Sequence, residues 1–394
     1  MPRTPTPPVL LGDEPGSFRR SVLADRHPAI IRQVREAFPY DAGVGRALDA
    51  LAANCARGVL EPLPADAPDL GRWRSWGLDD HLGTSWYDVP WLWSESYFYR
   101  RLLDAVGYFA PGVWQGIDPF RPFKLAELDS PETDGELAAL DALTALSAEE
   151  RGRALLHGSL WGNRADLGFR LSDADAEERA AVPGLVADDG DALWAALEGA
   201  ASVCLVADNA GRELVPDLLL LSHLLTERRI GRAVLHVKPY PYYVSDATPA
   251  DVLDAVRRLV AAGGGAGAAG EHGRRLWAAL SDGTLTVRAH PFSASPLPYT
   301  DMPDDLRADF AAASVTILKG DLNYRRLVGD RLWPPTTPFA DVTDYFPGTV
   351  AALRTLKSDV ITGLSARTEA ALTASEGQGW RIGGTRALIQ VRGV

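Results

Sequence analysis

The sequence is poor in cysteine and has no long apolar run. Of its 394 residues only Cys55 and Cys204 are cysteines, too few for a disulfide framework or a cysteine-based zinc site. This usage is typical of a reducing compartment, and we expect a cytoplasmic location. The longest apolar candidate, residues 214–225, is interrupted by Pro216 and Asp217 and is shorter than the roughly 18 residues of a membrane span. The sequence therefore predicts no contact with a membrane.

Positive charge is scarce relative to negative charge. The formal net charge is -12 and the sequence pI is about 5.1. Binding along a nucleic acid needs clustered Lys and Arg, so we expect no nucleic-acid partner. A small anionic ligand is compatible with this charge, because a pocket can be locally basic on an acidic protein. Residues 1–13 are Pro-rich and lack a basic region followed by an apolar run, so no signal peptide is predicted.

What the sequence does contain is a globular composition, 46% hydrophobic and 23% charged, divided into two regions. Residues 1–190 carry mostly apolar residues at three- and four-residue spacing, which predicts an α-helical amino-terminal region. The predicted helices in it are residues 28–38, 44–60, 94–106 and 135–156. Residues 191–394 are predicted to form an α/β domain.

The α/β domain is predicted from short β-branched runs that end in polar residues and are followed by helices. These runs are residues 202–207, 232–237, 284–289 and 314–318. Strands that alternate with helices predict a mainly parallel, doubly wound sheet. Ligands of such sheets bind beyond the carboxyl ends of the strands, where the polar clusters fall.

A glycine- and alanine-rich tract, residues 263–270, contains a formal G-x-G-x-x-G match. It follows a predicted helix, residues 249–262, and not a strand, so we reject it as a dinucleotide site. We expect it to be a flexible surface connector.

The first polar cluster is Asp208-Asn209-Ala210-Gly211, directly after a predicted strand. A carboxylate and an amide oxygen are hard ligands that suit Mg²⁺ or Mn²⁺. Gly211 allows a sharp turn into a helix, whose first free N–H groups would seat a phosphate. The structural alternative is that Asp208 or Asn209 only caps that helix.

The second cluster, residues 236–246, contains a Pro- and Tyr-rich loop that ends at Asp246. Its His236 lies in an apolar strand and is expected to be a hydrogen-bonded core residue and not a ligand. Its two prolines stiffen the loop, which would present Asp246 as a third oxygen ligand from a neighbouring strand end. Three protein ligands would leave open positions for water and a substrate phosphate oxygen. Alternatively, Asp246 is an N-cap or turn residue of the next helix.

The third cluster, residues 319–326, reads Lys-Gly-Asp-Leu-Asn-Tyr-Arg-Arg. Its Gly permits close backbone approach, its Lys and Arg complement an anion, and its Asp and Asn can bind sugar hydroxyls or a metal-bound water. A solvated helix face is the structural alternative.

Taken together, these clusters resemble the damage-control phosphatase family. The resemblance spans roughly residues 86–357 and includes segments 94–100 and 160–167 upstream. Arg354-Thr355-Leu356-Lys357, about 40 residues from the carboxyl end, resembles the Arg-Thr-x-Lys motif of the third subfamily.

The resemblance implies a metal-dependent phosphatase acting on sugar phosphates and similar small metabolites, with Mn²⁺, Ni²⁺, Co²⁺ or Mg²⁺ as cofactor. It implies metal ligation by Asp208, Asn209 and Asp246. Asp208 or Asp321 would orient the attacking water or act as nucleophile. The residues implied in substrate binding are Glu95, Asn163, Asp321, Asn323, Tyr324, Arg325 and Lys357.

Two other functions remain open on the sequence. An S-adenosylmethionine-dependent carboxyl methyltransferase would need a glycine-rich turn after the first strand, where Asp208 to Gly211 supplies one glycine. A non-catalytic sugar-phosphate-binding protein would need only the pocket.

Overall fold

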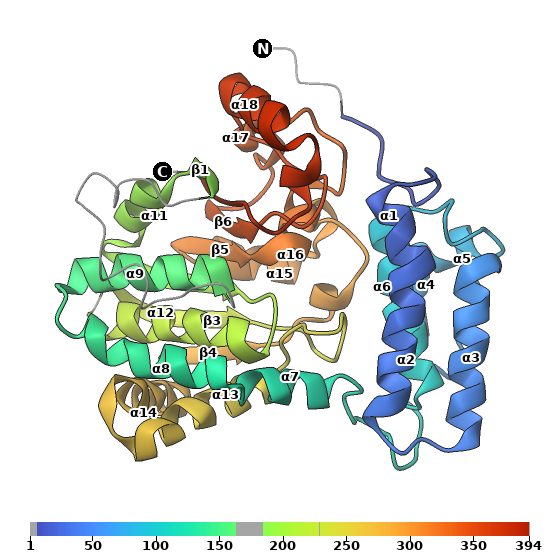
Figure 1. Cartoon of the computed structure of the whole chain (residues 1–394), viewed down its shortest axis with the longest axis horizontal. Helices are drawn as coiled ribbons and strands as arrows, with labels where there is room; N and C mark the ends of the chain where they lie inside the picture. Colours follow the sequence, from blue (N-terminus) through green and yellow to red (C-terminus); the bar gives the residue numbers. More distant parts are fainter. Residues whose placement is uncertain (1–5, 163–183, 228, 394) are drawn as a thin grey trace.

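The computed structural model describes residues 6–162, 184–227 and 229–393 of the chain. Figure 1 shows an amino-terminal group of helices, in blue and cyan, standing beside a sheet that is flanked by further helices. Among the described residues, no helix is long and apolar enough to cross a membrane.

The amino-terminal group confirms the helical prediction for residues 28–38, 44–60 and 94–106 to within one turn. Side-chain caps fix where its helices begin: the carboxylate of Asp41 accepts hydrogen bonds from the backbone N–H groups of Gly43 and Val44, at 2.7 and 3.0 Å. Its helices are α1 (Phe18–Ser21), the π-helical turn Val22–Arg26, α2 (His27–Ala37), α3 (Ala42–Arg57), α4 (Leu70–Ser75), α5 (Leu78–His81) and α6 (Trp91–Ala105).

Three helices follow this group, α7 (Arg121–Leu128), α8 (Pro131–Leu143) and α9 (Ala148–Trp161). The prediction of one helix over residues 135–156 is therefore wrong. A new helix begins because Ser147 and Glu150 form a capping box: the Ser147 hydroxyl accepts from the Glu150 N–H, and the Glu150 carboxylate accepts from the Ser147 N–H.

The seven-stranded sheet has the order β1-β7-β6-β5-β2-β3-β4. All neighbouring strands are parallel except β6 and β7, which are antiparallel, so the predicted mainly parallel α/β sheet is confirmed. Its strands are β1 (Leu185–Asp188), β2 (Ala200–Val206), β3 (Ile230–His236), β4 (Leu285–Arg288), β5 (Val315–Lys319), β6 (Thr349–Thr355) and β7 (Ala387–Arg392).

The sequence pattern predicts only β2 to β5 of these strands. Strand β1 pairs with β7 although it precedes residue 191, so the strand lies on the amino-terminal side of the predicted domain boundary. That boundary stays a prediction.

Helices cover both faces of the sheet (Figure 1). The glycine- and alanine-rich tract is not a flexible connector throughout, because α14 begins inside it at Gly267 and packs on α13. The helices of this part are α11 (Gly190–Leu197), α12 (Leu214–Thr226), α13 (Pro249–Ala261), α14 (Gly267–Asp282), α15 (Asp304–Ala311), α16 (Gly320–Val328), α17 (Phe339–Val342) and α18 (Ala366–Glu376), with 3-10 turns at Gly211–Glu213, Ala262–Gly265, Pro291–Ala294, Tyr299–Asp301 and Gly379–Arg381.

Alternate residues of the central strand β2 enter two separate cores, as the two-residue period of a strand requires. Val203 and Leu205 pack into the cluster that includes the leucines of α12. Cys204 and Val206 pack into the opposite cluster with aromatic residues of the later helices. A sheet buried on both faces exposes only its edges and strand ends for function.

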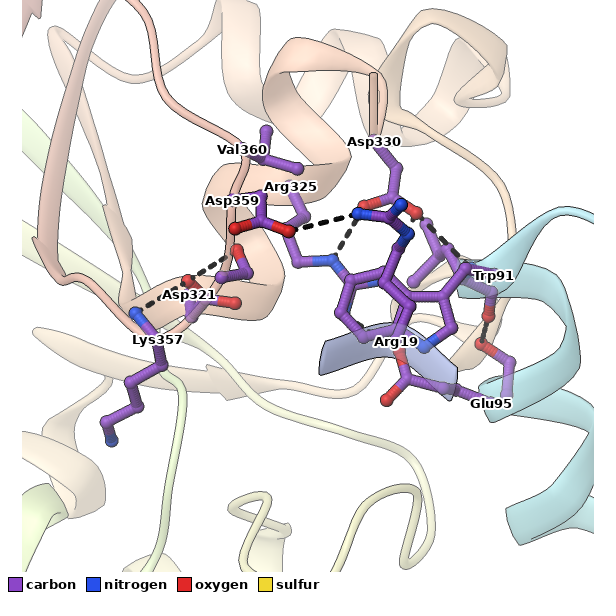
Figure 2. A network of polar contacts seen from close by, with 12 residues as sticks. Arg19, Trp91, Glu95, Asp321, Arg325, Asp330, Lys357, Asp359 and Val360 are labelled. Carbon is purple, nitrogen blue, oxygen red and sulfur yellow. Dashed lines mark hydrogen bonds and ion pairs between the residues drawn. The ribbon is translucent and has the colours of Figure 1, made fainter. Parts of the chain in front are cut away.

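A buried charge cluster joins the amino-terminal helices to α16. The guanidinium of Arg325 binds the carboxylate of Glu95, on α6, at 2.8 Å and that of Asp330 at 2.6 Å (Figure 2). It also lies 3.6 Å from the ring centroid of Trp91. The side chains of these three charged residues are no more than 7% exposed, so each charge depends on its partners for compensation.

We predict that Arg325→Met lowers the free energy of unfolding by about 3–5 kcal/mol, because it leaves two buried carboxylates unpaired. The matched control is Arg275→Met, which breaks the exposed pair with Glu271 and should change stability by no more than about 0.5 kcal/mol. Denaturant unfolding measures both. Equal losses in the two variants would show that the buried cluster does not join the regions.

Candidate active site

The carboxyl ends of β2, β3 and β5 bring the predicted ligand residues together. Asp208 and Asn209 follow β2, and Asp246 ends the loop after β3. Asn209 and Asp246 form an isolated antiparallel bridge. The backbone N–H of Ala247 donates to the carbonyl oxygen of Asp208 at 2.9 Å. Two segments more than thirty residues apart in sequence are thus tied into one unit.

Helix capping does not account for any of these three side chains. The residue before the 3-10 turn Gly211–Glu213 is Ala210, which makes no side-chain cap. Helix α13 is capped by Thr248, in a capping box with Asp251, and not by Asp246. The helix-capping alternatives for Asp208, Asn209 and Asp246 therefore lose their basis.

The amide of Asn209 has a fixed orientation. Its Nδ2 donates to Glu213 Oε2 at 2.9 Å, and its Oδ1 accepts from the Ser245 hydroxyl at 2.8 Å. An amide oxygen has two lone pairs, so Oδ1 keeps acceptor capacity for a cation.

The carboxylate of Asp246 is buried and that of Asp208 is half-buried, and little positive charge compensates the two. Burial, with the nearby charges of Asp246 and Glu213, raises the pKa of Asp208 well above its ordinary value. Burial also raises the pKa of Asp246, against the opposing effect of Lys238, whose Nζ lies 3.6 Å from Asp246 Oδ2. Oδ2 accepts no hydrogen bond from the residues described. An added cation would relieve this arrangement.

The side-chain oxygens of Asp208, Asn209 and Asp246 fit a hard divalent metal. No three His, Cys, Asp or Glu side chains form a metal cluster anywhere in the described chain, so a three-ligand site here needs the amide of Asn209. Two carboxylates and one amide oxygen are a donor set that suits Mg²⁺ or Mn²⁺.

Gly320, the first residue of α16, packs directly against Asp208. Its φ is +83°, and a Cβ built on it would lie 1.8 Å from Asp208 Oδ2 and 2.6 Å from Asp208 Cβ. Because the second atom adjoins the backbone, Asp208 cannot swing aside. Only glycine allows this approach.

Lys124, on α7, braces the same unit from behind. Its Nζ donates to the backbone carbonyl of Asp246 at 2.8 Å and to the carboxylates of Asp118 and Asp251 at 2.8 and 3.0 Å. The turn that carries Asp208 and Asn209 also contacts α7, since a Cβ on Gly211 would lie 3.2 Å from the Lys124 carbonyl oxygen. Helix α7 therefore contacts both ligand-bearing turns.

A cavity of about 280 Å³ opens beside Asp208 and Asn209. Its lining comes from α9, the β2 turn, α12, the β5 end, the β6 end and a glycine-rich turn near the carboxyl end. The lining residues are Ser159, Leu160, Trp161, Gly162, Asp208, Asn209, Glu213, Asp217, Lys319, Gly320, Leu353, Thr355, Lys357, Ile382, Gly383 and Gly384.

Lys319 supplies a buried cation to this cavity. Its Nζ lies 2.9 Å from Asp217 Oδ1 and donates to the carbonyl oxygen of Ser159. The Ser159 hydroxyl donates to the same Asp217 oxygen at 2.5 Å. Ser159 and Asp217 were missed from the sequence: Asp217 stands out only as a carboxylate inside a leucine-rich helix.

Lys357 supplies the second cation, at the rim. Its side chain is 48% exposed and its Nζ lies 3.8 Å from Glu213 Oε1. Of the residues predicted to bind substrate, Lys357 is the one that lines the cavity. Asn163 lies outside the described residues.

The five other predicted substrate residues have protein partners and do not appear in the cavity lining. Asp321 pairs with Arg354 at 2.7 Å. Glu95 and Arg325 are paired in the charge cluster described above. Asn323 donates to the carbonyl oxygens of Ala207 and Lys319 at 3.1 and 2.8 Å. The Tyr324 hydroxyl lies 3.0 Å from both Thr362 Oγ1 and Gln390 Oε1. Their role in substrate binding stays a prediction.

With this geometry in place, the chain can be compared with known proteins. Residues 22–372 match the family model described as "Damage-control phosphatase ARMT1-like domain". The chain belongs to this damage-control phosphatase family.

Relatives within the ARMT1-like family align over most of their length. Proteins named "Damage-control phosphatase ARMT1" are 30% identical in Danio rerio (78% of this chain, 74% of that protein), 27% in Mus musculus (98% and 99%) and 26% in Homo sapiens (96% and 97%). A solved structure of a DUF89 family protein from Pyrococcus horikoshii matches with 15% identity and a TM-score of 0.46, covering 85% of this chain and 92% of that one. That likeness is too distant to inform the site.

We predict that Gly320→Ala destabilises this ARMT1-like chain by at least about 3 kcal/mol, since the new methyl group would overlap Asp208. Gly283→Ala is the matched control: its φ is +81°, and a Cβ there meets nothing within 4 Å. The control should cost only about 1–2 kcal/mol, the strain of the left-handed conformation. Similar losses in the two variants, measured by denaturant unfolding, would contradict the close packing on Asp208.

Proposed function

We propose that the chain is a metal-dependent phosphatase of small phosphorylated metabolites such as sugar phosphates. The observation that carries the proposal is the meeting of Asp208, Asn209 and Asp246 at adjacent strand ends, beside a cavity that contains Lys319. Membership of the damage-control phosphatase family supports phosphate ester hydrolysis. The segment Arg354 to Lys357 supports the third subfamily.

The metal would be held by the carboxylates of Asp208 and Asp246 and by the amide oxygen of Asn209. When bound, Mn²⁺, Ni²⁺, Co²⁺ or Mg²⁺ would polarise the phosphoryl group and neutralise its charge. Asn209 would do more than supply a ligand oxygen to the metal, because its Nδ2 also donates a hydrogen bond that orients Glu213 at the cavity wall.

The two lysines would bind the phosphoryl oxygens from different sides. Lys319 is 6% exposed and held by Asp217 and Ser159, so it presents a fixed charge near Asp208. Lys357 is half exposed at the rim and can follow the substrate. Cationic groups placed where negative charge grows in the transition state are a main source of catalysis in phosphoryl transfer.

The cavity sets the size of the substrate. Its volume, about 280 Å³, lies just below the range of small-molecule pockets, which runs from roughly 300 to 1,000 Å³. Polar groups dominate near the ligand residues, and Glu213 and Thr355 can hydrogen-bond hydroxyl groups. A compact, hydroxylated phosphate ester matches these features.

The test is a phosphate-release screen. Chelator-treated protein is assayed with a panel of sugar phosphates and with each of the four metals. We expect release of inorganic phosphate only with metal. We also expect Asp208→Asn to lose at least about 100-fold in activity, because mutating a residue that merely hydrogen-bonds to a metal ligand already costs about 10–100-fold in metal affinity or activity. Asp304→Asn, on an exposed residue of α15, is the matched control and should retain full activity.

Metal-independent release, or full activity in Asp208→Asn, would overturn the proposal. No release with any metal, together with metal-independent binding of S-adenosylmethionine in a calorimetric titration, would favour the methyltransferase instead. Binding of sugar phosphates without turnover would favour a non-catalytic binding protein.

A further inference from the structure

The carboxylate of Asp321 is directed at the loop that carries Lys357. Its Oδ1 accepts hydrogen bonds from Arg354 Nε at 2.9 Å and Ser358 Oγ at 3.0 Å, and a longer one from the Lys357 backbone N–H at 3.4 Å. The guanidinium of Arg354 also pairs with it at 2.7 Å. Three residues on or beside β6 thus converge on one carboxylate oxygen. Figure 2 shows Asp321 beside the backbone of Lys357.

Arg354 is fully buried and holds the same loop. Its NH2 group donates to the Ser358 hydroxyl at 2.9 Å and to the Ser358 carbonyl oxygen at 3.2 Å, and its NH1 group donates to the Val360 carbonyl oxygen. Its guanidinium lies over the ring of Tyr324, 4.3 Å from the centroid. A side chain with these contacts cannot also reach a substrate, so the Arg of the Arg-Thr-x-Lys segment acts on the loop.

The amino-terminal helices hold the far side of this loop. Arg19, on α1, binds Asp359 at 3.0 Å (Figure 2). It also donates to the carbonyl oxygen of Leu11 at 2.9 Å. Arg19 is 8% exposed, which makes this a largely buried contact. Residues 357 to 360 are therefore fixed from both sides.

Lys357 itself depends on such anchoring. A lysine side chain loses up to about 2 kcal/mol of rotamer entropy when it is ordered. The backbone from which it extends has to be fixed for its Nζ to meet a substrate phosphate at little further cost.

We propose that Asp321 and Arg354 are positioning residues that set the place of Lys357, and that Asp321 is neither the nucleophile nor the base. This inference rests on the proposed phosphatase function. In this proposal the Asp321 and Arg354 side chains hold the loop of residues 357 to 360, and Lys357 contacts the substrate phosphate.

The experiment is a double-mutant cycle on a sugar phosphate that the wild-type enzyme hydrolyses with metal. Asp321→Asn keeps an acceptor oxygen for Arg354 and Ser358, so we expect kcat to stay within about tenfold of wild type. Asp321→Ala removes the acceptor and should raise KM by about 10–100-fold. In a Lys357→Met background, Asp321→Ala should add less than about threefold, because coupled residues are not additive.

If Asp321 is the nucleophile or the base, the opposite pattern of kcat and KM is expected. Asp321→Asn would then lose at least about 10³-fold in kcat, and the loss would be equally large in the Lys357→Met background. That result overturns the proposal. If Asp321→Ala does not fold, Ser358→Ala replaces it in the experiment. This variant removes the hydrogen bond from Ser358 to Asp321 and should raise KM severalfold when Lys357 is present, but not in the Lys357→Met background. Asp304→Ala is the exposed control and should change neither constant.

A binding measurement separates this inference from the proposed function. Inorganic phosphate is titrated into the metal-loaded wild type and variants by calorimetry, which needs no turnover. We expect Asp321→Ala and Lys357→Met to weaken phosphate binding to the same level, and the double variant to bind no more weakly. If no substrate is hydrolysed but this pattern is found, only the phosphatase proposal fails. Phosphate binding that is insensitive to Lys357 overturns the positioning role.

Discussion

Two carboxylates at the ends of adjacent parallel strands, Asp246 buried and Asp208 half-buried, are the constraint on which the rest of the structure depends. Asp208 and Asp246 are drawn together by the backbone bond from Ala247 to the Asp208 carbonyl and by the Asn209–Asp246 bridge. Lys238, 3.6 Å from Asp246, compensates only part of their charge. Burying carboxylates costs free energy, and the proposed metal would return part of that cost.

The elements around this site make contacts that hold its residues in place. Gly320 lets α16 begin against Asp208, and Lys124 fixes the Asp246 backbone from α7. The amino-terminal helices contribute through the Arg325 cluster and through Arg19, which reaches the loop after β6. The proposed catalytic site is thus held by contacts well outside the cavity, as a preorganised site requires.

Sequence reasoning recovered the parts of this arrangement that local pattern records. Strands β2, β3 and β5 each end in a polar cluster, and the parallel sheet that they imply places those clusters at one edge. Strands β6 and β7 escaped prediction because their antiparallel pairing, between residues 349–355 and 387–392, is set by tertiary contacts. The break before α9 depended on a capping box at Ser147 that the apolar periodicity runs across.

The side chains themselves were harder to assign, because burial is not visible in a motif. Asn323 and Tyr324 are polar in the sequence but fully buried, with their polar groups bound to protein atoms. Ser159 and Asp217 lie on separate helices, and only their packing brings them to Lys319. Both Lys319 and Lys357 belong to polar segments of the sequence, but only the structure places them around one cavity.

The most direct test of the central claim is anomalous scattering from a crystal of the protein soaked in manganese. The account predicts one anomalous peak bonded to the carboxylates of Asp208 and Asp246 and to the amide oxygen of Asn209. A peak bound elsewhere, or none at a site whose three side chains turn away from one another, would contradict it.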